Sequence, residues 1–286
     1  MIEVLGDYSF WTVAAGTMCL AVASSVIGTI SVLTRQSLIG DSLGHASYPG
    51  VLLSFMVFQS RNPFLLMLGA MLSGYLSYAL VRWMTKSARQ SLVNALSLVS
   101  AGFFGLGMVL KQYLQGNAAY QGVAQAGLQT YLFGQAAFIQ RDDVLLIFGV
   151  SMISLLLFLL YYQSFKLYLF DKAFAQVSGV KVAFLERMTT LLMIALIALG
   201  LKVVGAVLMS SFLIAPAVFG LLLGTSYRQA LLLSAASAVL SAFCGTFISS
   251  LVAGLSTGPT MIVFLSLFAF GAFIWINLFS RGGKHG

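Results

Sequence analysis

Charge is scarce in this chain. Only 8% of its 286 residues are charged, against about 25% in ordinary soluble domains, while hydrophobic residues make up 60% of the sequence. The few charged residues cannot cover the surface of a soluble protein of this length. The apolar part of the surface must therefore face lipid. The composition excludes a soluble globular protein and predicts an all-α bundle that crosses a membrane several times.

Cysteine is also rare, and the basic residues are not concentrated. Cys19 and Cys244 lie in apolar segments without CxxC spacing, so we interpret both as packing residues rather than disulfide or zinc ligands. The formal net charge is +8, but the Lys and Arg residues are scattered in small groups between apolar runs. This distribution is typical of topology signals and does not indicate a nucleic-acid partner.

Nine apolar runs are long enough to cross a membrane as helices, which takes about 20 residues each. They cover residues 9–33, 37–59, 63–84, 91–114, 144–163, 186–204, 206–223, 229–253 and 259–280. Only Gly205 separates the sixth run from the seventh, so eight spans with a re-entrant piece is the alternative. We expect a single transmembrane domain over residues 1–286, because the gaps at 115–143 and 164–185 are too short to build a soluble core. The first run is too long, and its start too acidic, for a cleaved signal peptide.

The Lys and Arg residues fall mostly on one side of the membrane if the N-terminus lies outside. The cytoplasmic side then carries Arg35, Arg82, Lys86, Arg89, Lys166, Lys172, Lys181, Arg187, Arg228, Arg281 and Lys284. The outer side keeps only Arg61, Lys111, Arg141 and Lys202. This asymmetry obeys the positive-inside rule, so it predicts an outer N-terminus and a cytoplasmic C-terminus.

One acid and one histidine fall within a predicted span. Asp41 and His45 are four residues apart, so their side chains share a helix face about one turn apart. A carboxylate in a span costs about 2.5–3.5 kcal/mol on insertion scales, which makes such a residue a functional candidate. The other acids fall at span ends or in gaps: Glu3, Asp7, Asp142, Asp143, Asp171 and Glu186.

Three interpretations of the Asp41–His45 pair are open. A carboxylate oxygen and an imidazole nitrogen suit manganese, iron or zinc. Two ligands are too few for a closed site, so other helices, backbone carbonyls or waters would complete it, and an incomplete shell suits an ion that must be released. The alternatives are an ion pair that joins helices and a general acid–base pair, although no GxSxG or HExxH motif accompanies the latter.

Two of the predicted spans contain a proline in their interior. Pro49, with Gly44 and Gly50 beside it, predicts a break after Tyr48. Pro216 predicts a kink or a discontinuous helix that faces a transport pathway. We therefore expect helix breaks near a pathway at both prolines.

A short helix is predicted in the inner gap. The segment from Asp171 to Ser178 is amphipathic, with Asp171 suited to an N-cap and Gly179 to a helix stop. Phe174 and Val177 are three residues apart, so they would form one apolar face. The helix is either a connector or a docking element for a cytoplasmic partner.

The segment RQSLIGDSLGHASYPGV resembles the signature of the metal-ion permeases of ATP-binding cassette transporters, R-x-x-L-x-G-D-x-x-x-H-x-x-x-P-G. The matching residues are Arg35, Leu38, Gly40, Asp41, His45, Pro49 and Gly50. Four more segments resemble this family, in order along nearly the whole chain: YLFGQAAFI (131–139), LFDKAFAQVSGVKV (169–182), VVGAVLMSSFLIAPAVFGLL (203–222) and LSTGPTMIVF (255–264).

The resemblance implies the permease subunit of an ATP-driven importer of manganese, zinc or iron, with manganese the first choice, in a prokaryotic cell membrane. It implies the fold of the cobalamin and siderophore importers, with two permease copies, a pair of cytoplasmic ATP-binding subunits and a metal-binding protein outside. Asp41 and His45 would hold the ion partway. Asp171, Phe174, Val177 and Gly179 fall in the segment that couples to the ATPase.

No Walker A sequence occurs in the chain, so we expect ATP hydrolysis on a partner and no enzyme activity here. The transported ion is the only metal expected, without a permanently bound cofactor. Two other functions could use the same pair of residues. An ion-coupled secondary metal carrier would need neither ATPases nor a docking helix, and an intramembrane metalloenzyme would need a water-activating base that the sequence does not show. A neighbouring ATPase gene would favour the importer.

Overall fold

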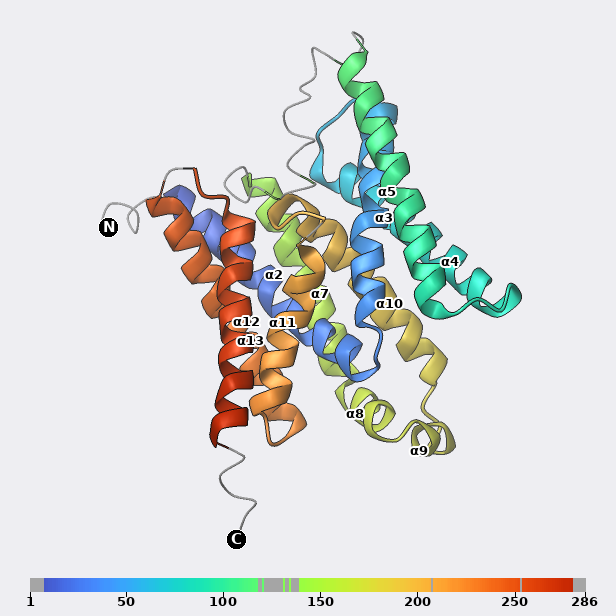
Figure 1. Ribbon diagram of the computed structural model, residues 1–286, viewed down its shortest axis with the longest axis vertical. Helices are drawn as coiled ribbons and strands as arrows, with labels where there is room; N and C mark the ends of the chain where they lie inside the picture. The colour runs from blue at the N-terminus through green and yellow to red at the C-terminus, as the bar shows by residue number, and fades with distance from the viewer. Residues whose placement is uncertain are drawn as a thin grey trace.

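The computed structural model describes residues 8–117, 120, 131, 134, 139–206, 208–252 and 254–279. Within these residues the regular structure is helical throughout, which confirms the all-α prediction (Figure 1). The helices are α2 (Tyr8–Leu33), α3 (Ser37–Phe58), α4 (Pro63–Ser87), α5 (Leu92–Gly116), α7 (Arg141–Leu160), α8 (Tyr162–Phe170), α9 (Lys172–Val177), α10 (Val182–Val203), α11 (Met209–Leu223), α12 (Tyr227–Leu251) and α13 (Thr257–Phe279).

Each of the nine predicted runs corresponds to one of the longer helices, although their ends differ by a few residues. In the described part of the chain, 7 helices are long and apolar enough to cross a membrane: α2, α4, α5, α7, α10, α12 and α13. Helix α3 has 22 residues but carries Asp41, His45 and four serines, and α11 has 15 residues, which span about 22 Å of a hydrocarbon core about 30 Å thick. The chain is a multi-pass membrane protein, and the count of nine spans is approximate.

The helices form two groups that α10 joins. Helices α3, α4 and α5 pack on one another, and α2, α11, α12 and α13 form the second group. Helix α10 contacts α2, α3 and α4 and is largely buried. Figure 1 shows α4 and α5 on one flank of the bundle and α12 and α13 on the other. The outer faces of α5 and α13 expose large apolar side chains, as expected for helices that face lipid or another membrane subunit.

Neither proline breaks its helix. Helix α3 continues through Pro49, and α11 continues through Pro216. A proline removes one backbone hydrogen bond, which neighbouring side chains can compensate inside a membrane protein. Pro49 frees the His45 carbonyl, and the Ser73 hydroxyl of α4 donates to the next carbonyl, that of Ala46, at 2.6 Å, which ties this turn to α4. The prediction of helix breaks at these two positions is therefore wrong.

The turn between α10 and α11 lies among the helices rather than at the surface. Val204 and Ala206 are 0% and 1% exposed. Gly44 of α3 lies so close that a Cβ built on it would be 2.9 Å from the Ala206 carbonyl oxygen. A Cβ on Gly258 of α13 would be 2.9 Å from the Val204 carbonyl oxygen. These contacts hold α3 and α13 against one short piece of backbone.

The segment at 131–139 is described only at Tyr131, Gly134 and Ile139, and its other residues lie outside the described part. The Tyr131 carbonyl accepts a hydrogen bond from the Ala206 N–H at 3.0 Å. Gly134 has a φ of +71° and packs against the backbone of the same turn. The segment between α5 and α7 thus reaches the turn that contacts α3.

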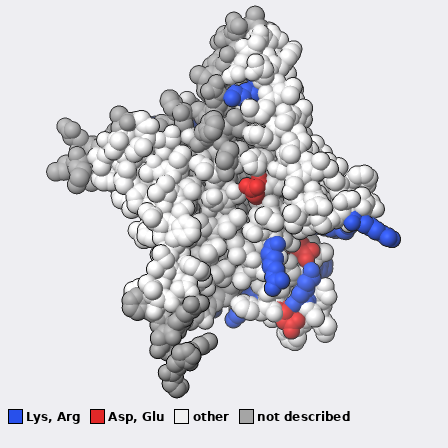
Figure 2. All heavy atoms as spheres, in the orientation of Figure 1, with Lys and Arg blue, Asp and Glu red and all other residues white. Residues whose placement is uncertain are grey.

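Basic side chains gather at one end of the molecule. Figure 2 shows Lys and Arg concentrated at the end of the bundle that carries α8 and α9. This is the end that the charge count places in the cytoplasm. Arg281 and Lys284, which belong to the same count, lie outside the described residues.

Candidate functional site

Asp41 and His45 lie side by side on α3, on the face that the sequence predicts. The His45 Nε2 atom is 3.9 Å from the Asp41 Oδ1 atom. This separation is too long for a direct hydrogen bond. A small rotation of either side chain would bring both atoms within the bond lengths of about 2.0–2.2 Å that one metal ion needs. The His45 side chain is 23% exposed and the Asp41 side chain is 51% exposed.

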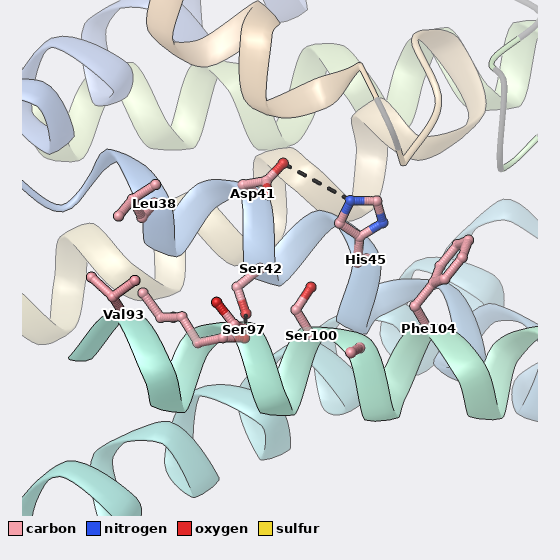
Figure 3. Close-up of a pocket in the computed structure, with 10 residues that line it drawn as sticks. Leu38, Asp41, Ser42, His45, Val93, Ser97, Ser100 and Phe104 are labelled. Atoms are coloured by element: carbon pink, nitrogen blue, oxygen red, sulfur yellow. Dashed lines mark hydrogen bonds and ion pairs between the residues drawn. The ribbon is translucent and has the colours of Figure 1, made fainter. Parts of the chain in front are cut away.

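The pair opens into a cavity of about 330 Å³ between α3 and α5 (Figure 3). Its walls are Leu38, Asp41, Ser42, His45, Val93, Leu96, Ser97, Ser100, Ala101 and Phe104. The Phe104 ring meets the His45 ring edge to face, with 5.1 Å between the ring centres. This contact positions the imidazole without consuming its Nε2 atom.

The second nitrogen of His45 has no partner. Its Nδ1 atom is buried and makes no hydrogen bond within the described part of the chain. Histidines that hold a metal permanently almost always donate their other N–H to a carboxylate, carbonyl or water, which strengthens the ligand.

The described residues give the Asp41–His45 pair no third ionisable neighbour, since no other His, Cys, Asp or Glu among them joins the pair. The remaining donors in the cavity are the hydroxyl groups of Ser42, Ser97 and Ser100. Neither Pro49 nor Pro216 lines this cavity. The cavity therefore gives no support to the prediction that the two prolines lie near a transport pathway.

The short inner helix forms as predicted. The Asp171 carboxylate accepts a hydrogen bond from the Phe174 N–H at 2.8 Å, which caps α9. Gly179 follows the helix with a φ of +81°. Phe174 and Val177 are 56% and 89% exposed, so the apolar face of α9 is left without a covering element of this chain.

A polar cluster that the sequence did not reveal ties α9 to α10. The Lys172 ammonium donates to the Glu186 carboxylate at 2.8 Å. The Tyr168 hydroxyl donates to the same carboxylate at 3.4 Å. Burial first, and then the negative charge of Glu186, raise the pKa of Tyr168 to about 12, so this phenol keeps its proton at neutral pH. The cluster therefore links α8 and α9 to α10 by polar contacts.

Sequence reasoning also missed a buried ion pair. Lys202, near the end of α10, donates to Asp143 at 2.6 Å, and the Asp143 side chain is only 5% exposed. Asp143 also accepts from the Gln140 N–H at 2.8 Å, closing a capping box at the start of α7. Asp143 is therefore far more buried than Asp41, although it lies at the end of a span, as the sequence predicts. The spacing of Gln140 and Asp143 is the signal that could have located it.

Comparison with known proteins agrees with the motifs. The model of the ABC 3 transport family matches residues 7–276. The manganese transport system membrane protein MntC of Bacillus subtilis is 35% identical over 255 residues, which are 89% of this chain but only 58% of that relative. The zinc transport system membrane protein TroC of Treponema pallidum is 34% identical over 266 residues, 93% of this chain and 88% of the relative.

A solved structure shares the fold. A chain of PsaBC from Streptococcus pneumoniae, in complex with Fab, superposes with a TM-score of 0.85 at 22% identity, over 97% of this chain and 98% of that one. The fold and the family resemblance expected from the sequence are confirmed. The chain belongs to the ABC 3 transport family.

Proposed function

We propose that this chain is the permease subunit of an ATP-driven importer of divalent transition-metal ions, and that Asp41 and His45 bind the ion on its way across. The observation that carries this proposal is the 3.9 Å gap between the two side chains at the wall of an open cavity. The gap is too wide for a hydrogen bond, and a small side-chain rotation would let both atoms bind one ion. The manganese and zinc transport named for the relatives MntC and TroC supports the class of cargo.

A second copy of the chain would complete the metal shell. Two ligands fall short of the four or more that such ions take. The outer face of α5 exposes Leu98 and Val109, and between them Gly102 and Gly105 have no neighbouring atom within 4 Å of an added Cβ. Small residues let membrane helices approach closely. A two-fold pairing through α5 would place two cavities, and so two carboxylates and two imidazoles, at one interface.

The uncovered face of α9 favours the importer over an ion-coupled secondary carrier. Phe174 and Val177 are exposed on a capped helix, and Lys172 links that helix to α10. An apolar face of this kind fits a groove on a partner protein. We assign it to the cytoplasmic ATP-binding subunits, which supply the ATP hydrolysis that this chain lacks. A metal-binding protein would deliver the ion from outside.

Manganese is the first choice of cargo, with zinc and iron as the alternatives. The carboxylate, the serine hydroxyls and the waters that the cavity can hold are oxygen donors, which suit manganese. The imidazole of His45 suits all three ions.

The test replaces each ligand singly in the complex with its ATPase and binding protein. Asp41→Ala and His45→Ala should abolish uptake of manganese, because each removes half of this chain's contribution to the shell. Co-purification of the ATPase should persist, since neither side chain lies near α9. Asp142→Ala, an exposed acid of α7, is the matched control and should transport normally. Normal uptake by both ligand variants would refute the proposed metal role.

A further inference from the structure

Two serines on α5 face the metal pair across the cavity. Ser97, Ser100 and Phe104 follow one another at three- and four-residue steps, so they share one face of α5. Figure 3 shows the Ser97 and Ser100 side chains pointing from α5 toward α3, where Asp41 and His45 lie. The cavity therefore has one wall that carries charge and one wall that carries hydroxyl groups.

The third serine of the cavity is already engaged. The Ser42 hydroxyl of α3 donates to the Leu96 carbonyl at 3.4 Å, which joins α3 to α5. Ser97 is exposed to the cavity and Ser100 is half-buried. These two hydroxyls are the neutral oxygen donors that an ion held by Asp41 and His45 would meet next.

The cavity has room for a partly hydrated ion. Its volume is about 330 Å³, and one water molecule takes about 30 Å³ of liquid volume. An ion bound by the pair would therefore keep several waters, and hydroxyl groups on the opposite wall could bind the ion or orient those waters.

The hydroxyl groups of Ser97 and Ser100 affect which metal ion this site would prefer. For a given set of nitrogen and oxygen ligands zinc binds more tightly than manganese, so selectivity has to come from ligand type and geometry. Neutral oxygen donors and retained waters suit the hard manganese ion, whereas sulfur ligands suit zinc and other soft ions.

We propose that Ser97 and Ser100 add neutral oxygen donors to the shell of the transported ion, directly or through its waters, and bias the site toward hard ions such as manganese. This inference rests on the proposed metal-binding role of Asp41 and His45. It assigns to α5 a part in cargo selection that is separate from the two charged ligands.

The experiment uses the full complex, reconstituted in liposomes with its ATPase and binding protein. Manganese uptake is measured alone and in competition with zinc and with cadmium, for S97A/S100A, S97C, S100C and S97T/S100T. Ser266→Cys on α13, at the opposite flank of the bundle, controls for a new thiol elsewhere in the membrane (Figure 1).

The expected results separate a ligand from a packing residue. S97A/S100A should raise the manganese KM by roughly tenfold, the usual scale for loss of groups that support a metal. Serine and cysteine are nearly equal in size, so a packing role predicts no change on cysteine substitution. A ligand role predicts that S97C or S100C lowers by roughly tenfold the cadmium or zinc concentration that blocks manganese uptake. S97T/S100T keeps the hydroxyls and should restore the wild-type preference among metals.

Two results would overturn the inference. One is an S97A/S100A complex with wild-type KM and wild-type metal preference. The other is a pair of cysteine variants that respond to cadmium and zinc as Ser266→Cys does. Asp41→Ala and His45→Ala are assayed in the same liposomes. If they abolish uptake while the serine variants change nothing, only the role of α5 fails. If they transport normally, the proposed function itself fails.

Discussion

The Lys202 ammonium donates a hydrogen bond to the Asp143 carboxylate at 2.6 Å, and the Asp143 side chain is only 5% exposed. The pair joins the last turn of α10 to the first turn of α7. Removing one member of a buried pair leaves an uncompensated charge, which costs more than replacing both members. The two helix ends are therefore held together by charge as well as by packing.

Asp143→Ala should lower the free energy of unfolding by about 3–5 kcal/mol, the range for breaking a buried pair. Lys202→Met should have a similar cost. The double variant should cost clearly less than the sum, because no charge is then left unpaired. Unfolding of the purified protein in detergent, followed for all four members of the cycle, measures this coupling. Asp142→Ala is the exposed neighbour and should be near neutral; strictly additive losses would argue against the pair.

The α5 interface can be tested by cross-linking. In a background with Cys19 and Cys244 replaced by Ala, Gly102→Cys or Gly105→Cys should form a disulfide-linked dimer on mild oxidation. Disulfides need Cα atoms about 4.4–6.8 Å apart, so only helices in direct contact can react.

Gly271 on α13 is the matched control for this experiment. It is equally open, with no atom within 4 Å of an added Cβ, but it lies on the other flank of the bundle (Figure 1). Gly271→Cys should stay monomeric. Equal cross-linking at Gly271, or none on α5, would contradict pairing through α5.

Docking of the ATPase depends on the apolar face of α9. Phe174→Asp should prevent co-purification of the ATP-binding subunit while the permease still inserts in the membrane, because a carboxylate cannot enter an apolar groove without a partner. Gln176→Asp places the same charge on an exposed polar position of the same helix and should bind normally. An intact, transport-competent Phe174→Asp complex would instead assign this face to the lipid headgroups.

Topology can be read from two exposed positions. Gln176 is exposed on the polar side of α9, and Leu255 is 46% exposed in the turn between α12 and α13. In the cysteine-free background, a membrane-impermeant thiol reagent should label Leu255→Cys in intact cells and Gln176→Cys only after permeabilisation. Labelling of both from one side would overturn the charge-based orientation.

Apolar length predicted the helices well but not all of their ends. The fifth run was expected from residue 144, whereas α7 begins at Arg141, because Asp143 closes a capping box there. The sixth was expected from residue 186, whereas α10 begins at Val182 and includes Glu186, whose charge is neutralised by Lys172. Both shifts come from polar partners, Gln140 in the same turn and Lys172 on another helix, which hydropathy does not register.

The sequence alone was enough to identify the ionisable residues of the candidate site, but not its serines. Asp41 and His45 stand out because ionisable residues are rare in spans. Ser97 and Ser100 do not stand out, since serine is common in membrane helices and their meaning depends on α5 packing beside α3. Likewise, Asp143 and Lys202 lie 59 residues apart, and only the arrangement of α7 and α10 brings them together.

The close approach of Gly44 to the Ala206 carbonyl limits how this site can adapt. A side chain at Gly44 would have to displace backbone that also touches α13 at Gly258, so the part of α3 next to His45 tolerates little variation. On the cavity face of α5, by contrast, Ser97 is exposed and Ser100 is half-buried, so substitutions there meet the cavity rather than backbone. Change in cargo preference by mutation is therefore more accessible along α5 than along the helix that carries the charged ligands.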